Sequence, residues 1–173
     1  MQALLRQTDR RLRAMLPLFT CVLLGVIGLT PLGLPHLDAA SPALALMAVF
    51  YWSIFRSDLM TMVGAFLAGL FLDLLGGGTP GLNALILLLT HELGVSQRKV
   101  FLGSSFLVNW AGFALVASGA ILLGWTVVSL LHWQPLPLVP RLAQWALSLA
   151  FYPAVYWLLS RIERRWLRPA LTV

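Results

Sequence analysis

The sequence contains little cysteine and little charge. A single cysteine, Cys21, excludes a disulfide within the chain and a metal site built on thiolates. Only 10% of the residues are charged and 60% are hydrophobic, with a mean hydropathy of +0.87, a composition far from that of a soluble domain. The chain also lacks long polar segments, and its loops reach only about ten residues. Such loops are too short to form a folded unit outside the membrane. Residues 1–173 are therefore predicted to form a single integral membrane domain.

Basic residues recur between the apolar runs. Eleven of the twelve Lys and Arg residues fall into four groups along the chain: Arg6, Arg10, Arg11 and Arg13; Arg56; Arg98 and Lys99; and Arg161, Arg164, Arg165 and Arg168. Only Arg141 falls on the other side of the predicted membrane. Because cytoplasmic loops of membrane proteins retain Lys and Arg, this spacing predicts six membrane crossings with both chain ends in the cytoplasm.

The net charge of +6 raises the question of nucleic-acid binding. The basic residues, however, are divided among short loops and termini and form no single basic stripe. Membrane topology and attraction to anionic lipid explain this distribution better, so we expect membrane lipid and no nucleic acid as a partner. The basic N-terminus would also suit a cleaved signal peptide. The apolar run that follows reaches the ~20 residues of a crossing, so the first span is predicted to be retained.

The apolar runs predict an all-α fold of six transmembrane helices, at about 14–34, 42–55, 59–75, 82–96, 103–131 and 141–160. The second run contains Tyr51 and Trp52, an aromatic pair suited to the membrane interface. Several runs are short for a crossing, whereas the stretch from 100 to 131 is longer than the ~20 residues required. That stretch is predicted to be tilted, broken or preceded by an interfacial piece.

Two of the six acidic residues lie inside apolar runs. The other four are predicted to be solvated in termini or loops: Asp9, Asp38, Asp58 and Glu163. Asp73 precedes a glycine-rich break, and an ionised carboxylate at mid-membrane costs ~2.5–3.5 kcal/mol, which favours a role for this side chain. Glu92 lies near Arg98 and Lys99 and is predicted to snorkel to the interface or to form a local pair.

Asp73 belongs to a line of small residues. Ala65, Gly69, Asp73 and Gly77 recur at four-residue spacing and therefore share one helix face. Such small-residue ridges allow helix backbones to approach closely in a membrane. Asp73 would then accept hydrogen bonds from a neighbouring helix or from N–H groups of the glycine segment 76–81. Three roles stay open for this face: pinning the internal bundle, which we favour, docking a partner, and proton or ligand chemistry.

No constellation of residues supports catalysis. His91 and Glu92 open a zinc-protease motif, but no second histidine follows one turn later. Ser104 and Ser105 lie roughly 40 Å from His132 along one predicted helix, too far for a nucleophile and its base. The glycine segment lacks the lysine of a phosphate-binding loop. The chain is therefore predicted to be no enzyme and to hold neither metal nor cofactor.

A longer pattern runs through the middle of the chain. It consists of a proline-led short helix that ends in an aromatic pair, a Gly-Leu-x-x-Asp segment and a glycine turn, formed here by Pro42, Tyr51-Trp52, Gly69-Leu70, Asp73 and Gly81-Leu82-Asn83. This pattern resembles the central signature of the MreD family of bacterial rod shape-determining membrane proteins. The resemblance makes Gly69, Asp73 and Gly81 candidates for an essential structural feature. Ala65 and Gly77 join them as candidates for a structural or partner-contact role because of the four-residue spacing.

The resemblance implies a non-enzymatic scaffold or regulator in the inner (cytoplasmic) membrane, within the complex that builds lateral cell wall. Its implied partners are an MreC-like bitopic protein, the glycosyltransferase and transpeptidase pair that makes peptidoglycan, and the MreB-type cytoskeleton, directly or through other proteins. The family's fold is similar to the six-helix substrate-binding subunits of vitamin transporters. A transport subunit is therefore the alternative function, with a ligand in its outer half and residues 36–41 and 132–140 as a lid.

Overall fold

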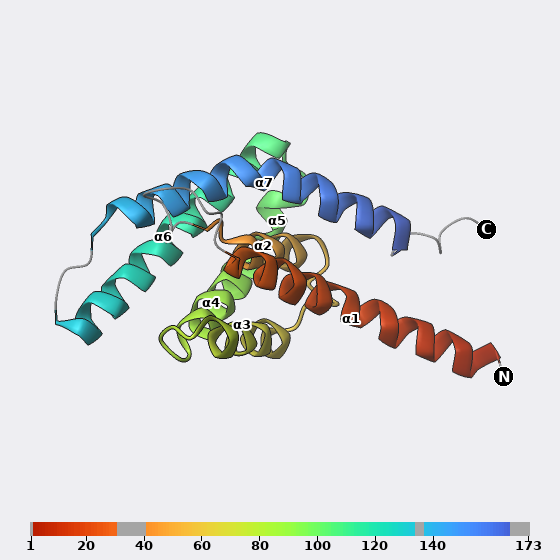
Figure 1. Ribbon diagram of the computed structural model, residues 1–173. Coiled ribbons are helices and arrows are strands. Elements are labelled where there is room, and N and C mark those ends of the chain that lie inside the picture. The colour runs from red at the N-terminus through yellow and green to blue at the C-terminus, as the bar shows by residue number, and fades with distance from the viewer. Residues whose placement is uncertain (1, 31–40, 134–136, 167–173) are drawn as a thin grey trace.

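The computed structural model describes residues 2–30, 41–133 and 137–166, and all regular structure in these ranges is helical (Figure 1). Its seven helices are α1 (Gln2–Leu29), α2 (Leu44–Phe55), α3 (Met62–Gly76), α4 (Leu82–Ser96), α5 (Arg98–Phe101), α6 (Phe106–His132) and α7 (Val139–Trp166). The end of the first predicted span, 31–34, and the predicted lid segment 36–40 lie outside the described residues. For the described part of the chain, the all-α prediction is confirmed.

Three predicted spans correspond closely to helices: 42–55 to α2, 59–75 to α3 and 82–96 to α4. The stretch from 100 to 131 is broken, because α5 ends at Phe101 and α6 begins only at Phe106. The first and last helices are longer than predicted, since α1 begins at Gln2 and α7 continues to Trp166. The flanking segments are rich in Arg, Leu, Gln and Glu, which are good helix formers, so they extend these helices.

Helix α2 is the central helix of the molecule. Ten of its twelve residues are buried, and it packs against α1, α4, α5, α6 and α7. This burial agrees with its sequence, which has no polar stripe that could face water. Tyr51 and Trp52 are only 2% and 0% exposed. Neighbouring helices cover both side chains, so the pair does not face lipid headgroups, and its depth in the membrane stays a prediction.

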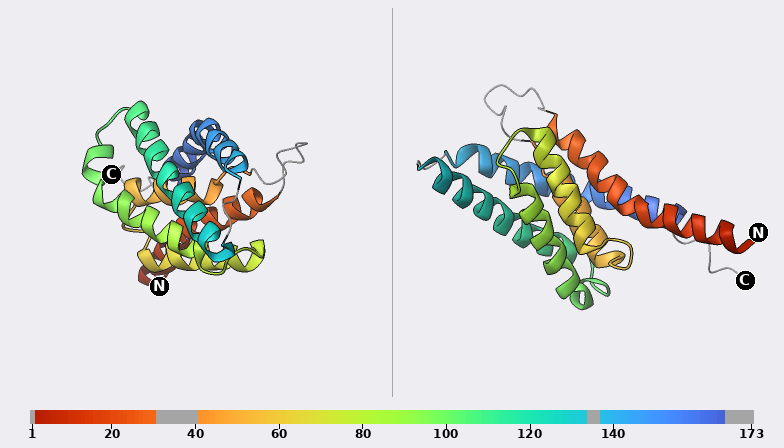
Figure 2. Two further views of the ribbon diagram at one scale, coloured as in Figure 1. Left: turned by 90° about the vertical axis from the view of Figure 1, so that its left-hand side faces the viewer. Right: turned by 90° about the horizontal axis from the view of Figure 1, so that it is seen from below.

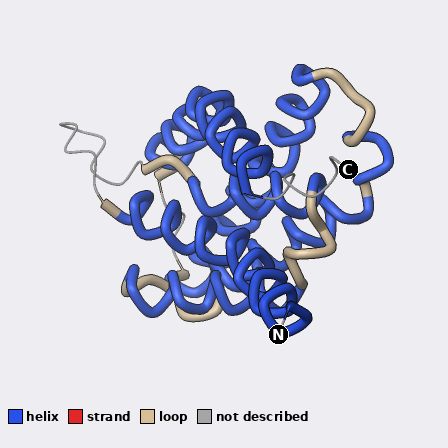
Figure 3. The backbone as a smooth tube through the Cα atoms, turned by 90° about the vertical axis from the view of Figure 1, so that its right-hand side faces the viewer, coloured by secondary structure: helices blue, strands red, loops and turns tan. Residues whose placement is uncertain are grey.

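The long helices run between two ends of the molecule, as the right-hand view of Figure 2 shows. At the terminal end, α1 begins and α7 ends, and the Arg98 Nε donates a hydrogen bond of 3.0 Å to the Ile54 carbonyl oxygen at the end of α2. At the distal end, α1, α3 and α6 end and α2, α4 and α7 begin. The connections between helices are short where the structure describes them (Figure 3), and the longest comprises residues 56–61.

Two helices are long and apolar enough to cross a membrane: α6 and the segment Val139–Arg165 of α7. Four shorter apolar helical segments accompany them, namely Met15–Leu29, α2, α3 and α4. A helix of about 15 residues is roughly 22 Å long, less than the ~30 Å of a bilayer's hydrocarbon core. The described residues thus form an all-helical, membrane-capable molecule, and the number of crossings stays a prediction.

Candidate functional site

The small-residue ridge of α3 lies on the face that packs against α4. Ala65 and Gly69 are both buried there. A Cβ added to Gly69 would lie 2.4 Å from the Cα of Ala84 and 2.7 Å from the carbonyl oxygen of Asn83. Because these are backbone atoms of another element, they cannot rotate away as a side chain would. Gly69 therefore allows the first turn of α4 to lie directly on α3.

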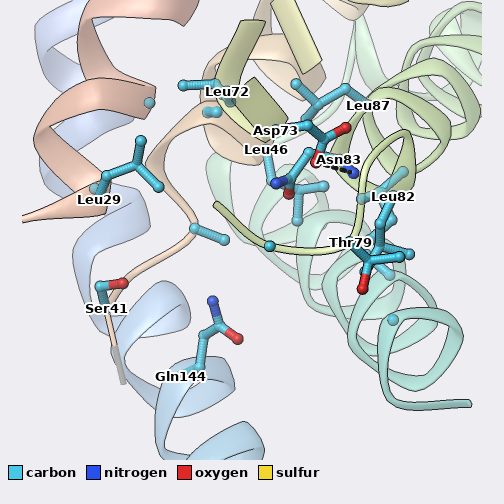
Figure 4. A pocket seen from close by; sticks show the side chains of 18 of the residues that line it. Leu29, Ser41, Leu46, Leu72, Asp73, Thr79, Leu82, Asn83, Leu87 and Gln144 are labelled. Carbon is cyan, nitrogen blue, oxygen red and sulfur yellow. Dashed lines mark hydrogen bonds between the residues drawn. The ribbon is translucent and has the colours of Figure 1, made fainter. Parts of the chain in front are cut away.

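Asp73 lies one turn after Gly69 and is 5% exposed. Its Oδ1 accepts a hydrogen bond of 3.0 Å from the Asn83 N–H (Figure 4). Its Oδ2 accepts one of 3.2 Å from the Ala84 N–H. The first N–H groups of a helix have no acceptor within the helix, and the helix dipole favours a negative charge at this end. Asp73 on α3 therefore caps α4. The donors belong to the neighbouring helix and not to the glycine segment.

Gly77 and Gly81 shape the turn between these helices. Gly77 ends α3 with a φ of 61°, and Gly81 precedes α4 with a φ of 85°. Both angles lie in the left-handed region that favours glycine. A Cβ at either position would meet nothing within 4 Å. Glycine is therefore favoured at these two positions by the backbone conformation and not by close neighbours. The part of the ridge that packs against α4 ends at Asp73.

A cavity of about 770 Å³ lies at the distal end beside this turn; we call it the distal cavity. Figure 4 shows Asp73 and Asn83 on the α3–α4 side and Gln144 of α7 across from them. His132 and Arg141 also line the cavity, whereas most of its other lining side chains are apolar. The cavity thus brings polar groups from α3, α4, α6 and α7 to one place, which no spacing in the sequence indicates.

Two hydrogen bonds between side chains tie α2 to its neighbours. The Tyr51 hydroxyl donates a hydrogen bond of 2.7 Å to Oε2 of Glu163, and the Trp52 Nε1–H donates one of 2.9 Å to the Thr20 hydroxyl. The prediction that Glu163 is simply solvated is therefore wrong, because its carboxylate is a partner of a buried tyrosine. These pairs are 112 and 32 residues apart in the sequence, so no local pattern could have revealed them.

The residues considered for catalysis are used structurally or lie apart. The Nε2 of His91 is 2.9 Å from the carbonyl oxygen of Met60, and its Nδ1 is 3.3 Å from Oε1 of Glu92. Glu92 thus has a local partner, and its side chain is 54% exposed. Ser105 precedes α6 and His132 ends it, so the two lie at opposite ends of one helix. No group of three His, Cys, Asp or Glu that could hold a metal ion occurs within residues 2–30, 41–133 and 137–166.

One protein family matches most of the sequence. The model of the family described as rod shape-determining protein MreD matches residues 8–162 of the 173. No curated protein and no solved structure matches the chain. The matched range contains the whole of α2 to α6, including the Gly69 contact and the Asp73 cap. The resemblance seen in the sequence is confirmed, and the chain belongs to the MreD family of rod shape-determining proteins.

Proposed function

We propose that this protein is a non-enzymatic scaffold in the inner (cytoplasmic) membrane, within the complex that builds the lateral cell wall of rod-shaped bacteria. The observation that carries the proposal is the family match over residues 8–162, because membership in this family supports a role in determining rod shape. The two membrane-capable helices and the four shorter apolar ones support a multi-pass arrangement. The protein would act by binding other membrane proteins and not by a reaction of its own.

The proposed topology has six crossings with both chain ends in the cytoplasm. Arg56, Arg98 and Lys99 lie near the terminal end, as do the start of α1 and the end of α7, whereas Arg141 lies near the distal end. This distribution favours a cytoplasmic terminal end. The short helix α2 is compatible with this topology, because irregular backbone at membrane depth is tolerated where other parts of the protein surround it.

The proposed partners are an MreC-like bitopic protein, the glycosyltransferase and transpeptidase pair, and the MreB-type cytoskeleton, directly or through other proteins. Contacts would form sideways, since apolar side chains point outward along α3 and α6; Val63 and Leu115, for example, are 65% and 77% exposed. Binding of a partner's membrane helix would stabilise the assembled state of the complex, which shifts populations without any chemical step.

The five candidate residues are proposed to act inside the protein. Gly69 and Asp73 contact α4, Ala65 is buried on the same face of α3, and Gly77 and Gly81 form the connecting turn. Together they hold α3 and α4 in one relative orientation. Partners would therefore meet the outer faces of these helices in a fixed geometry, although none of the five residues need touch a partner.

Depletion of the protein in a rod-shaped host, combined with copurification in mild detergent, tests this function. We expect rounded cells and recovery of an MreC-like protein and the wall-synthesis pair with the tagged chain. A Gly69→Leu variant should restore neither shape nor copurification, whereas Gly103→Ala, at a position with no atom within 4 Å of the added Cβ, should restore both. Unaltered shape together with recovery of an ATPase module and a stoichiometric small ligand would instead indicate a transport subunit.

A further inference from the structure

Arg141 is the exception among the basic residues. The other eleven Lys and Arg residues belong to segments assigned to the terminal end, whereas Arg141 lies in the first turn of α7, at the distal end. A cation on the translocated side works against the charge bias that sets membrane topology. An interaction that compensates for this charge is therefore expected at the distal end.

Arg141 lines the distal cavity beside a neutral neighbour. Its Nη1 donates a hydrogen bond of 3.4 Å to Oε1 of Gln144. Asp73, the acidic residue among those lining the cavity, already accepts two backbone N–H groups of α4. Among the described residues, no carboxylate forms an ion pair with Arg141. The positive end of the α7 dipole lies at the same place, so this wall of the cavity favours an anion.

A second hollow of about 540 Å³ adjoins the distal cavity between α4 and α6; we call it the α4–α6 groove. Ile86 and Ala120 line both hollows, so the two meet at these side chains. The groove is lined mainly by apolar side chains, and Leu89 and Leu115 on its rims are 40% and 77% exposed. Gly119 lines the groove without filling it, since even an added Cβ at this position would meet no atom within 4 Å.

We propose that an anionic phospholipid occupies both hollows, with its phosphate beside Arg141 in the distal cavity and one acyl chain in the α4–α6 groove. The volume of the cavity lies within the ~300–1,000 Å³ typical of ligand sites. The polar groups Gln144, His132 and Asn83 line the cavity, whereas the groove is apolar, and this division matches a lipid better than a uniformly polar small molecule. Binding requires membrane insertion but not the partner contacts proposed above, so each proposal can fail without the other.

Native mass spectrometry of the full-length protein in detergent, with phosphatidylglycerol or phosphatidylcholine added, tests this site. We expect the wild-type protein to retain phosphatidylglycerol in preference to phosphatidylcholine. Arg141→Gln should weaken the binding of phosphatidylglycerol about tenfold, the effect of losing one charge-assisted contact. The matched control is Arg161→Gln, on the same helix but at the terminal end, where Arg161 lies 5.2 Å from the ring centre of Trp157. This control should bind phosphatidylglycerol as the wild type does.

Gly119→Leu tests the acyl-chain half of the site. The new side chain should fill the groove and weaken the binding of phosphatidylglycerol, and an unchanged thermal unfolding temperature would show that the variant is folded. Soluble glycerol phosphate should bind far more weakly than the lipid to the wild type, because it lacks the chain. Equally tight binding of glycerol phosphate would overturn the lipid assignment in favour of a small anionic ligand.

Three further results would overturn the proposal. The first is that the wild-type protein retains phosphatidylcholine as well as phosphatidylglycerol. The second is that Arg141→Gln and Arg161→Gln weaken the binding of phosphatidylglycerol equally, which would indicate a general attraction between the lipid and basic surface residues. The third concerns Asp38, which lies outside the described residues. If Asp38→Asn and Arg141→Gln lower the unfolding temperature equally and neither changes lipid binding, Arg141 is the partner of that carboxylate and not of a lipid.

Discussion

The α3–α4 hairpin and the α6–α7 pair pack their helices in different ways. In the hairpin, two helices of 15 residues approach until backbone meets backbone, at Gly69 and Ala84. In the pair, helices of 27 and 28 residues are joined through large side chains, and the rings of Phe113 and Tyr152 stack with centres 4.3 Å apart. The packing of the hairpin thus depends on the missing side chain of Gly69. The packing of the pair depends on large side chains such as Phe113 and Tyr152.

The polar contacts differ in the same way. In the hairpin, the Asp73 carboxylate binds backbone N–H groups of the neighbouring helix. In the pair, the indole N–H of Trp145 donates to the Ser118 hydroxyl at 3.0 Å, and that of Trp110 donates to the Leu149 carbonyl oxygen at 3.1 Å. Side chains can adopt new rotamers, whereas backbone atoms in contact cannot. The comparison therefore indicates a rigid hairpin beside a more adaptable pair, with the α4–α6 groove at the border between them.

The largest effect is expected from Gly69→Leu, which breaks the hairpin. Any side chain at this position meets the backbone of α4 within 2.4 Å, so α3 and α4 must separate. We expect a loss of about 3 kcal/mol or more in the free energy of unfolding, the upper range for overpacked sites. Unfolding by sodium dodecyl sulfate in mixed micelles measures it. A Gly69→Leu protein as stable as Gly119→Leu would show that the hairpin adapts as readily as the pair.

The second effect concerns the cap at Asp73. Asp73→Ala leaves two backbone N–H groups of α4 without their acceptor in a buried site, which should cost about 2 kcal/mol. Asp73→Asn keeps one amide oxygen as an acceptor and removes the charge, so its loss should be smaller while membrane insertion is preserved. The same micelle unfolding experiment, together with copurification of partners, measures both variants. If Asp73→Asn is as stable and assembles as well as the wild type, the ionised carboxylate has no role in the hairpin.

The sequence predicts the hairpin well because its signals are local. Four-residue spacing places Ala65, Gly69 and Asp73 on one face, and a carboxylate in an apolar run must find donors nearby. The structure supplies those donors from α4, within 11 positions along the chain. Short-range patterns of this kind depend only on helix geometry, so they can be read before the fold is known.

The burial of α2 could not be predicted in this way. An aromatic pair at the end of an apolar run has the same composition whether it faces lipid headgroups or other helices, so the sequence does not reveal that neighbouring helices bury Tyr51 and Trp52. Only the packing of five other helices around α2 distinguishes the two cases. The Tyr51 bond to Glu163 and the distal cavity have the same origin, since both join segments that lie far apart in the sequence.

A smaller effect is expected in the α6–α7 pair from Trp145→Phe. The variant loses the hydrogen bond to Ser118 but keeps an aromatic ring against α6. Hydrogen bonds between membrane helices contribute about 0.6 kcal/mol on average, so we expect a loss of that size. Micelle unfolding again provides the measurement, with Trp157→Phe, whose side chain is 60% exposed, as the control. A loss as large as that of Asp73→Ala would mean that the pair is fixed as rigidly as the hairpin.

The smallest effect is expected from Leu115→Ala, on the outer face of α6. Leu115 is 77% exposed, and the lipid tails that would surround it are as apolar as leucine itself, so its loss should change the free energy of unfolding by less than about 0.5 kcal/mol. Leu72→Ala in the hairpin is the matched change, because Leu72 is only 4% exposed and its removal leaves a cavity costing about 2 kcal/mol or more. Comparing the two leucines by micelle unfolding separates lipid-facing from internal surface. Equal losses would show that the outer face of α6 is covered by protein, as it would be in a dimer that persists in detergent.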